Sequence, residues 1–228
     1  MNKLLSIETS AESCSVALSI FDDTWEKFEH APRRHAELIL PMVSSLLSDA
    51  ELALGQLDGI AFGRGPGSFT SLRIGIGVVQ GLAWGADLPV VRVSSLAAVA
   101  QAALERGLPP GVGRICVAMD ARMQEVYTAD FEVDVDGFVI LSGEERVCPP
   151  GEVRPEDPAG VCAAGNGFEV YPELEKLARE LGHCLPDCWP RAGVVSRLAA
   201  RWLESNKPLP AAQAQPVYIR NKVANKPT

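Results

Sequence analysis

The residues most suggestive of chemistry form a glycine-rich loop at positions 63–68, which reads Gly-Arg-Gly-Pro-Gly-Ser. An apolar strand is predicted just before this loop, and a helix is predicted from Ser68 onward. Glycines between a strand and a helix can hold a phosphate on the backbone N–H groups of the helix N-terminus. The loop is therefore a candidate phosphate-binding turn, with a purely structural turn as the alternative.

The loop departs from the established motifs for phosphate binding and nucleophilic catalysis. A P-loop needs G-x-x-x-x-G-K-[ST], and no lysine lies nearby. The dinucleotide pattern G-x-G-x-x-G is interrupted by Pro66, although Asp87, about 20 residues further on, keeps a dinucleotide site as a weak alternative. A nucleophile elbow needs G-x-S-x-G, and Thr70 stands where its last glycine would be.

The cysteines and histidines predict no metal centre. His183-Cys184-x3-Cys188 offers soft ligands, but no second cysteine pair lies near it, so structural zinc is the weaker alternative to buried, reduced thiols. Cys14 has no evident histidine partner, which argues against a thiol nucleophile.

Composition excludes several function classes. Among 228 residues, 47% are hydrophobic and 22% charged, typical of a globular protein. Lys and Arg number 21 against 29 Asp and Glu, a formal charge of −8, so the chain has no global attraction to a phosphate backbone. No apolar N-terminal leader or membrane-length apolar run is apparent, and we expect a cytoplasmic protein that does not associate with membranes.

Hydrophobic periodicity and turn residues divide the chain into two similar halves. Residues 1–106 are predicted to run β-β-β-α-β-α-β-α, and a run of proline and glycine at 109–113 marks a boundary. Three strands and an alternation with helices then begin again. We expect an α/β protein with an N-terminal lobe at 1–106, a C-terminal lobe at 107–207 and a tail at 208–228 that packs back on the N-terminal lobe.

The helix predicted at 68–84 is unusually apolar. Arg73 is the only charged residue between Gly65 and Asp87, and each of three glycines inside the helix costs about 1 kcal/mol of helix propensity relative to alanine. A helix that is apolar all round is normally buried all round. We expect one of its faces to meet a partner, together with the amphipathic helix predicted at 35–52; a central position within one lobe is the alternative.

The segment 65–75, GPGSFTSLRIG, resembles the GPGSFTGLRIG signature of the TsaB (YeaZ) family, with Ser71 in place of the usual glycine. Further matches to this family occur in order along nearly the whole chain. They are Ile7-Glu8-Thr9-Ser10, His35-Ala36-Glu37, Leu40-Pro41, Asp120-Ala121-Arg122, Glu125-Val126-Tyr127, Gly165-Asn166-Gly167 and Tyr218-Ile219-Arg220.

The resemblance implies an actin-like, Hsp70-like ATPase (ASKHA) fold, in which each of two related lobes has a mixed sheet and flanking helices. It also implies a scaffold that works with its paralogue TsaD and the ATPase TsaE. Together they place threonylcarbamoyl on the adenosine 3′ of certain tRNA anticodons. On this view the isolated chain is a homodimer without cofactor, ATP–magnesium enters through the partners, and tRNA is held mainly by the complex.

Family members dimerise through the first two long helices, which correspond here to 35–52 and 68–84. The partner interface that this implies comprises His35, Leu38, Ile39, Met42, Val43, Leu46, Phe69, Leu72, Arg73, Ile76, Val79 and Gln80. The turns that resemble phosphate loops supply the candidate nucleotide contacts Thr9, Ser10, Gly65 and Gly67.

The resemblance argues against catalysis by this chain. The catalytic paralogue binds metal with a His-x-x-x-His pair, and Ser95 and Val99 stand at those positions here. Neither side chain is a useful ligand for a divalent metal. Relatives that hydrolyse ATP carry an Asp in the first hairpin, where this chain has Glu8. We expect no catalytic residue, with a stand-alone ATPase, small-molecule kinase or peptidase of the same fold as the alternative.

Two small basic spots offer contacts at the rim of a partner or to tRNA phosphates, with ordinary solvated charges as the alternative. They are Arg33, Arg34 and His35 near the first helix, and Arg220, Lys222 and Lys226 in the tail.

Overall fold

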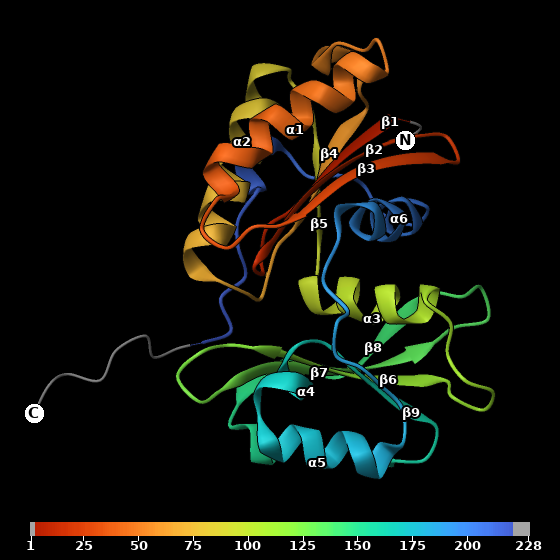
Figure 1. The fold of residues 1–228 in the computed structure, drawn as a ribbon. Coiled ribbons are helices and arrows are strands. Elements are labelled where there is room, and N and C mark those ends of the chain that lie inside the picture. The colour runs from red at the N-terminus through yellow and green to blue at the C-terminus, as the bar shows by residue number, and fades with distance from the viewer. Residues whose placement is uncertain (1–2, 221–228) are drawn as a thin grey trace, which may run out of the picture.

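The computed structural model describes residues 3–220, which fold into two stacked lobes, each built on a five-stranded sheet (Figure 1). The strand order is β3-β2-β1-β4-β5 in the first lobe and β8-β7-β6-β9-β10 in the second. The two orders are the same, so the predicted α/β fold of two related lobes is confirmed. This duplicated arrangement is the one expected of the actin-like fold.

The first sheet joins a meander to two parallel strands. β2 pairs antiparallel with β1 and β3, while β4 is parallel to both β1 and β5. Its strands are β1 (Lys3–Glu8), β2 (Ser13–Ile20), β3 (Asp23–His30), β4 (Gly59–Gly63) and β5 (Val90–Val93). β1 and β4 are almost wholly buried, as their continuous apolar runs predict for strands covered on both faces.

The second sheet repeats this pattern. Its strands are β6 (Arg114–Asp120), β7 (Val126–Val133), β8 (Val139–Cys148), β9 (Val161–Ala164) and β10 (Cys184–Leu185). The helices of the chain are α1 (His35–Asp49), α2 (Phe69–Gly85), α3 (Ser95–Glu105), α4 (Gly167–Val170), α5 (Pro172–Leu181) and α6 (Ala192–Leu203), with short 3-10 turns η1 (Leu54–Gln56), η2 (Pro150–Glu152) and η3 (Ala211–Gln213).

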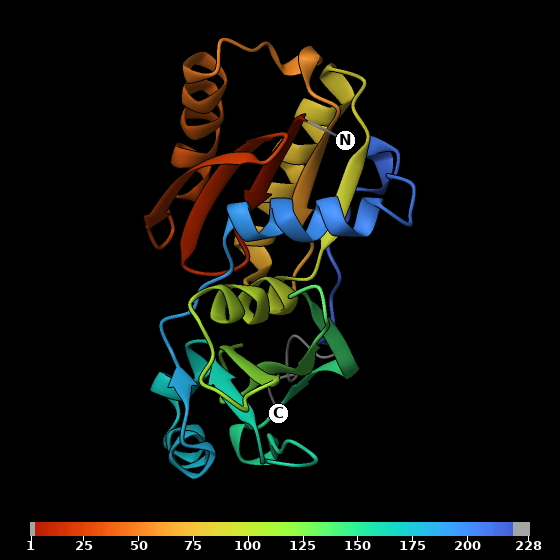
Figure 2. The same ribbon diagram turned by 90° about the vertical axis from the view of Figure 1, so that its right-hand side faces the viewer.

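The lobes exchange helices, which corrects the predicted boundaries. α3 packs on the second sheet, where Leu96 and Val99 meet Ile115. α6 follows the second sheet in sequence but packs on the first, with Val195 against Leu4. The two helices form a layer between the sheets (Figures 1 and 2). Cuts after residues 106 and 207 would therefore assign each helix to the sheet that it does not cover.

The described part of the tail, residues 208–220, returns to the first lobe. The backbones of Leu209 and Val90 exchange two hydrogen bonds at the edge of β5, with N···O distances of 2.8 and 2.7 Å. Ala214 is fully buried in the first core. Lys222 and Lys226, predicted as part of a basic spot, lie outside the described residues.

No helix within residues 3–220 is both long and apolar enough to cross a membrane.

Candidate functional site

α1 and α2 form a layer on the outer face of the first sheet, and they run in the same direction. α1 follows β3 and α2 follows β4, and both of these strands are parallel to β1 through the pairings of the sheet. The N-termini of both helices therefore lie at the end of the lobe that faces the second lobe, and the layer presents one outer surface (Figure 1).

Most side chains predicted for the partner interface point into the core of their own lobe instead. These are His35, Ile39, Met42, Val43, Leu46, Leu72, Ile76 and Val79, all of them buried. An apolar stripe at i, i+3 and i+4 faces the sheet that the helix covers. The residue-level prediction is corrected for this set, because a partner would have to contact the opposite face of the helices.

The other predicted interface residues reach the surface to differing degrees. Phe69 is 46% exposed and Arg73 is exposed, whereas Leu38 and Gln80 are partly buried. The Gln80 amide donates to the carbonyl of Ala214 in the tail at 2.7 Å. Phe69 and Arg73 thus lie on the open side of the layer, at the N-terminal end of α2.

Glycines dominate the outward face of α2. A Cβ added at Gly77, Gly81 or Gly85 would meet nothing within 4 Å in the described part of the chain, so packing among residues 3–220 does not require glycine there. At Gly75 an added Cβ would lie 2.1 Å from the Thr9 Oγ1, so this glycine is fixed by contact with the first hairpin. The spacing of four residues places the three open glycines along one side of the helix.

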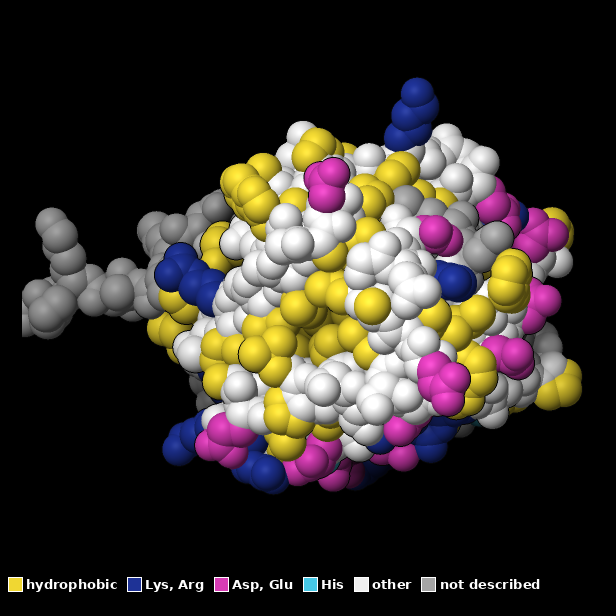
Figure 3. Space-filling view, turned by 90° about the horizontal axis from the view of Figure 1, so that it is seen from above, with side chains coloured by type: hydrophobic (Ala, Val, Ile, Leu, Met, Phe, Trp, Pro, Cys, Tyr) yellow, Lys and Arg dark blue, Asp and Glu magenta, His cyan; other side chains and the backbone are white. Residues whose placement is uncertain are grey.

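An exposed tryptophan lies at the end of this glycine face. The side chain of Trp84 is 73% exposed and borders a pocket of about 370 Å³ that also includes Leu88, Pro89 and Pro210. Seen from above the first lobe, apolar side chains gather around a hollow while most charged side chains lie toward the rim (Figure 3). Exposed aromatic rings and few charges are typical of the centre of a protein–protein interface.

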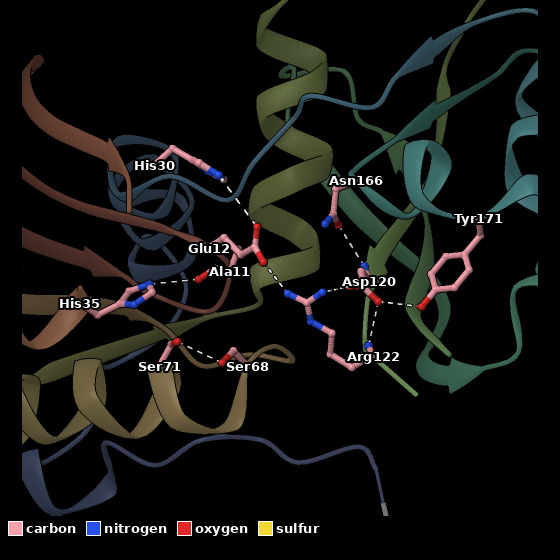
Figure 4. Close-up of polar contacts among 10 residues, drawn as sticks. All are labelled: Ala11, Glu12, His30, His35, Ser68, Ser71, Asp120, Arg122, Asn166 and Tyr171. Atoms are coloured by element: carbon pink, nitrogen blue, oxygen red, sulfur yellow. Dashed lines mark hydrogen bonds and ion pairs between the residues drawn. The ribbon is translucent and has the colours of Figure 1, made fainter. Parts of the chain in front are cut away.

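A cleft of about 900 Å³ separates the lobes below the N-terminus of α2. Glu12 of the first lobe forms an ion pair with Arg122 of the second, and His30 Nε2 lies 3.9 Å from Glu12 (Figure 4). Arg122 also pairs with Asp120 at 3.0 Å. The Tyr171 hydroxyl donates to Asp120 at 2.8 Å. The cleft is therefore crossed by a chain of charged groups that are paired with one another.

The candidate nucleotide contacts are engaged in contacts within the first lobe. The Thr9 hydroxyl donates to the Ser71 carbonyl at 3.0 Å, and the Ser68 N–H donates to the Ser10 carbonyl at 2.7 Å. A Cβ on Gly67 would lie 2.3 Å from that same Ser10 oxygen. Ser10 and Gly67 line the cleft, whereas Thr9 and Gly65 do not, and nucleotide contact by any of the four stays a prediction.

Ser68 was predicted as the N-cap of α2, and the helix does begin directly after it, but the capping hydrogen bond is missing. Ser68 occupies the cap, but its side chain accepts no N–H of the helix. Its hydroxyl instead lies 3.0 Å from the Ser71 hydroxyl (Figure 4). Ser71, the departure from the family signature, is buried there without disturbing the helix.

Glu8 is a buried carboxyl at the end of β1. It accepts hydrogen bonds from the Ser10 N–H at 2.6 Å and from the Ser95 hydroxyl at 2.9 Å. Burial raises the pKa of Glu8 above its ordinary value of 4.5, although these hydrogen bonds oppose the shift. Glu8 thus links the first hairpin to the start of α3 and does not open into the cleft, whose lining it does not join.

Glu8→Gln is expected to make the free energy of unfolding less dependent on pH. At neutral pH, the variant should have a higher free energy of unfolding than the wild type. Because the folded-state pKa lies above 4.5, the stability contributed by protonated Glu8 is fully present below that pH and is lost as the pH rises through the folded-state pKa. Gln keeps the shape of the side chain and cannot ionise. Urea unfolding at several pH values would measure this, and an unchanged pH slope in the variant would contradict it.

Five of the six cysteines are buried, and Cys184 is partly buried. Burial raises the pKa of Cys14 to about 12 and those of Cys162 and Cys184 to about 11, so these thiols stay protonated at neutral pH. Within residues 3–220, no three His, Cys, Asp or Glu side chains are grouped as a metal site would need. Ser95 and Val99 are fully buried.

The chain is similar to proteins of one family over nearly its whole length. A family model described as "TsaD: tRNA N6-adenosine threonylcarbamoyltransferase" matches residues 29–180. The "tRNA threonylcarbamoyladenosine biosynthesis protein TsaB" of Escherichia coli (strain K12) is 39% identical, with 97% of this chain and 96% of that protein covered. The protein of that name from Haemophilus influenzae is 38% identical, with 96% and 94% covered.

A solved structure agrees with these relatives. "YeaZ from Pseudomonas aeruginosa" is 41% identical and superimposes with a TM-score of 0.87. The match covers 96% of this chain and 100% of the YeaZ chain. The signature at 65–75, the duplicated sheet order and these full-length matches are consistent with one another. The chain therefore belongs to the TsaB family of tRNA threonylcarbamoyladenosine biosynthesis proteins.

Proposed function

We propose that this chain is a non-catalytic scaffold subunit in the formation of threonylcarbamoyladenosine on tRNA. It docks a TsaD-type paralogue through the outward face of α1 and α2 and acts together with a TsaE-type ATPase. Alone, it pairs with a second copy through the same face. The reaction that it supports takes place in the cytoplasm, and ATP–magnesium and most of the tRNA contacts are supplied by the partners.

The observation that carries this proposal is the row of open glycines on α2. Each glycine lowers helix stability by about 1 kcal/mol relative to alanine. Among residues 3–220, no other part of the chain lies within 4 Å of a Cβ added at Gly77, Gly81 or Gly85. Small residues let the backbone of a second helix approach closely. A paralogous partner of the same fold carries helices equivalent to α1 and α2, and so offers a helical surface of matching kind.

The interior of the chain supports a role without catalysis. Ser95 lies at a position where the paralogue has a metal-binding histidine, and its hydroxyl is already bonded to Glu8 in the core. Val99 packs in the second core. Neither position faces the cleft in which a substrate would bind.

Charge supports tRNA binding through the complex and not by this chain alone. The chain carries a net charge of −8, and two arginines that line the cleft are paired with carboxylates, Arg122 with Glu12 and Arg220 with Glu125. Binding to a phosphate backbone depends on basic groups that are free to replace its counterions.

A stand-alone enzyme remains the second candidate, because the cleft of about 900 Å³ is large enough for a nucleotide. Tight binding of ATP–magnesium by the isolated chain would favour it. Turnover that persists after loss of the glycine face would favour it further.

The proposal is tested by reconstituted tRNA modification with the paralogue, the ATPase and a threonylcarbamoyl donor. Product should form only when this chain is present, and the chain alone should form none. Equal product in its absence would show that the chain is not a required subunit.

A further inference from the structure

The last described segment of the chain, residues 209–220, forms a strap that connects the α2 layer with the second lobe. It begins at the edge of β5, passes along α2 where Gln80 donates to Ala214, and continues with the Val217 N–H donating to the Arg64 carbonyl at 2.8 Å. Arg220, the last described residue, lies among residues of the second lobe. The strap therefore spans the distance between the docking helix and the cleft.

Arg220 is anchored on the turn between β6 and β7. Its guanidinium forms an ion pair with Glu125 at 2.5 Å and donates to the Arg122 carbonyl at 3.3 Å. It also lies over the Tyr127 ring, 5.8 Å from the centroid. The side chain is only 15% exposed, so this end of the strap is well seated on the second lobe.

The turn that Arg220 holds is strained. Arg122, Met123 and Gln124 are consecutive non-glycine residues with φ values of 60, 57 and 59°. L-residues adopt this left-handed conformation at an energetic cost, and they do so as single residues far more often than in runs. Such strain persists only where the surroundings enforce it, and Arg220 bonds directly to both ends of the turn.

The strap also contacts the proposed docking face of α2. The Arg73 Nε donates to the Tyr218 hydroxyl at 3.0 Å, and its guanidinium lies 3.9 Å from the centroid of the Phe69 ring. The Phe69 and Tyr218 rings are 5.4 Å apart and are 46% and 45% exposed. Phe69 and Arg73 of α2 and Tyr218 of the strap thus form one half-exposed stack.

We propose that the strap is a conformational coupler: a partner on α2 covers the Phe69–Arg73–Tyr218 stack, stabilises the seated strap and so fixes the strained turn at the interlobe cleft. The proposal rests on the docking function proposed above. Covering the two rings favours the state in which they are assembled, and a ligand that binds one state better shifts the population toward it. Seating of the strap and docking on α2 then promote each other.

The free chain tests the coupling without any partner. Three amides report on the turn, because the N–H groups of Ala121, Arg122 and Glu125 all donate hydrogen bonds within it. Tyr218→Ala should raise hydrogen exchange at these amides several-fold, and Arg220→Ala should raise it on the order of tenfold, as loss of a charge-assisted contact implies. Trp25→Ala removes a ring of similar exposure, 50%, from β3 and should leave the exchange unchanged.

Docking tests the functional half of the proposal. Addition of the TsaD-type paralogue to the wild-type chain should slow exchange at the same three amides. Arg220→Ala should weaken its affinity by roughly threefold to tenfold, since only the seated fraction binds well. Arg179→Ala removes another surface arginine of the second lobe, one paired with Glu175, and should bind as the wild type does.

Two outcomes would overturn the proposal. The first is wild-type exchange at the turn in both the Tyr218→Ala and Arg220→Ala chains, with thermal unfolding showing that both are folded. The second is wild-type paralogue affinity of Arg220→Ala. Failure of the paralogue to bind the wild-type chain would instead count against the docking function, and the free-chain exchange would still decide whether the strap holds the turn.

Discussion

Gly81→Trp is expected to abolish docking of the paralogue while leaving the chain folded. A Cβ at Gly81 meets nothing within 4 Å, so the larger side chain has room in the isolated lobe. The substitution also removes part of the glycine cost in the helix. In the complex, an indole would occupy the space that a partner helix needs. We expect affinity to fall at least about 100-fold, or roughly 2.7 kcal/mol, by calorimetry or surface plasmon resonance.

Gly151→Trp is the matched control for this variant. Gly151 lies in η2 of the second lobe, and an added Cβ there also meets nothing within 4 Å. It should dock the paralogue with wild-type affinity. Equal, undiminished affinity of Gly81→Trp and Gly151→Trp would mean that the glycine face of α2 is not the docking surface.

Gly67→Ala is expected to destabilise the folded chain strongly. The new Cβ would lie 2.3 Å from the Ser10 carbonyl oxygen and 2.6 Å from its Cβ. Most of this obstacle is backbone, which cannot rotate away as a flexible side chain could. We expect a destabilisation of about 3 kcal/mol, at the upper end for overpacking, and a drop in melting temperature of roughly 6–12 °C.

Thermal unfolding followed by circular dichroism measures this effect. Gly55→Ala, in η1, is the control, because its added Cβ meets nothing within 4 Å and should change stability little. A melting temperature of Gly67→Ala within a degree or so of the control would contradict the close contact between the loop and the first hairpin. The contact makes Gly67 a requirement of packing, which supports the structural reading of a loop that resembles a phosphate-binding turn.

The helices and strands could be predicted because each has a strong local signal. The 3.6-residue periodicity of α1 and the apolar runs of β1 and β4 depend on neighbouring residues alone. The exchange of α3 and α6 between the lobes could not be predicted in this way. Each helix has an apolar face, but nothing in its local sequence says which sheet that face will meet.

The partner interface was predicted on α1 and α2, but most of the side chains named for it are buried in the lobe. Apolar residues such as Ile39 and Val79 were natural candidates for an interface, yet the same residues build the core of the lobe. The sequence does contain the better signal, in the spacing of Gly77, Gly81 and Gly85. A helical glycine can be needed for packing inside the lobe, as Gly75 is against Thr9, or it can leave space at the surface. Only the structure distinguishes these two cases.

The charged bridge across the cleft and the strap were beyond reach from sequence. Glu12 and Arg122 are 110 residues apart, and no local pattern relates them. The left-handed run from Arg122 to Gln124 contains no glycine, the residue that usually indicates a positive φ. The match at Tyr218-Ile219-Arg220 drew attention to this segment. It did not show that Tyr218 contacts Arg73 in the first lobe while Arg220 contacts Glu125 in the second.

The measurement that tests the central claim most directly is tRNA threonylcarbamoylation reconstituted from purified components, with the wild-type chain, with Gly81→Trp, and without any chain. We predict product with the wild-type chain only, and none from the chain without its partners. Full product in the reaction that lacks the chain would contradict the scaffold function. Product formed by the chain alone would contradict its assignment as non-catalytic.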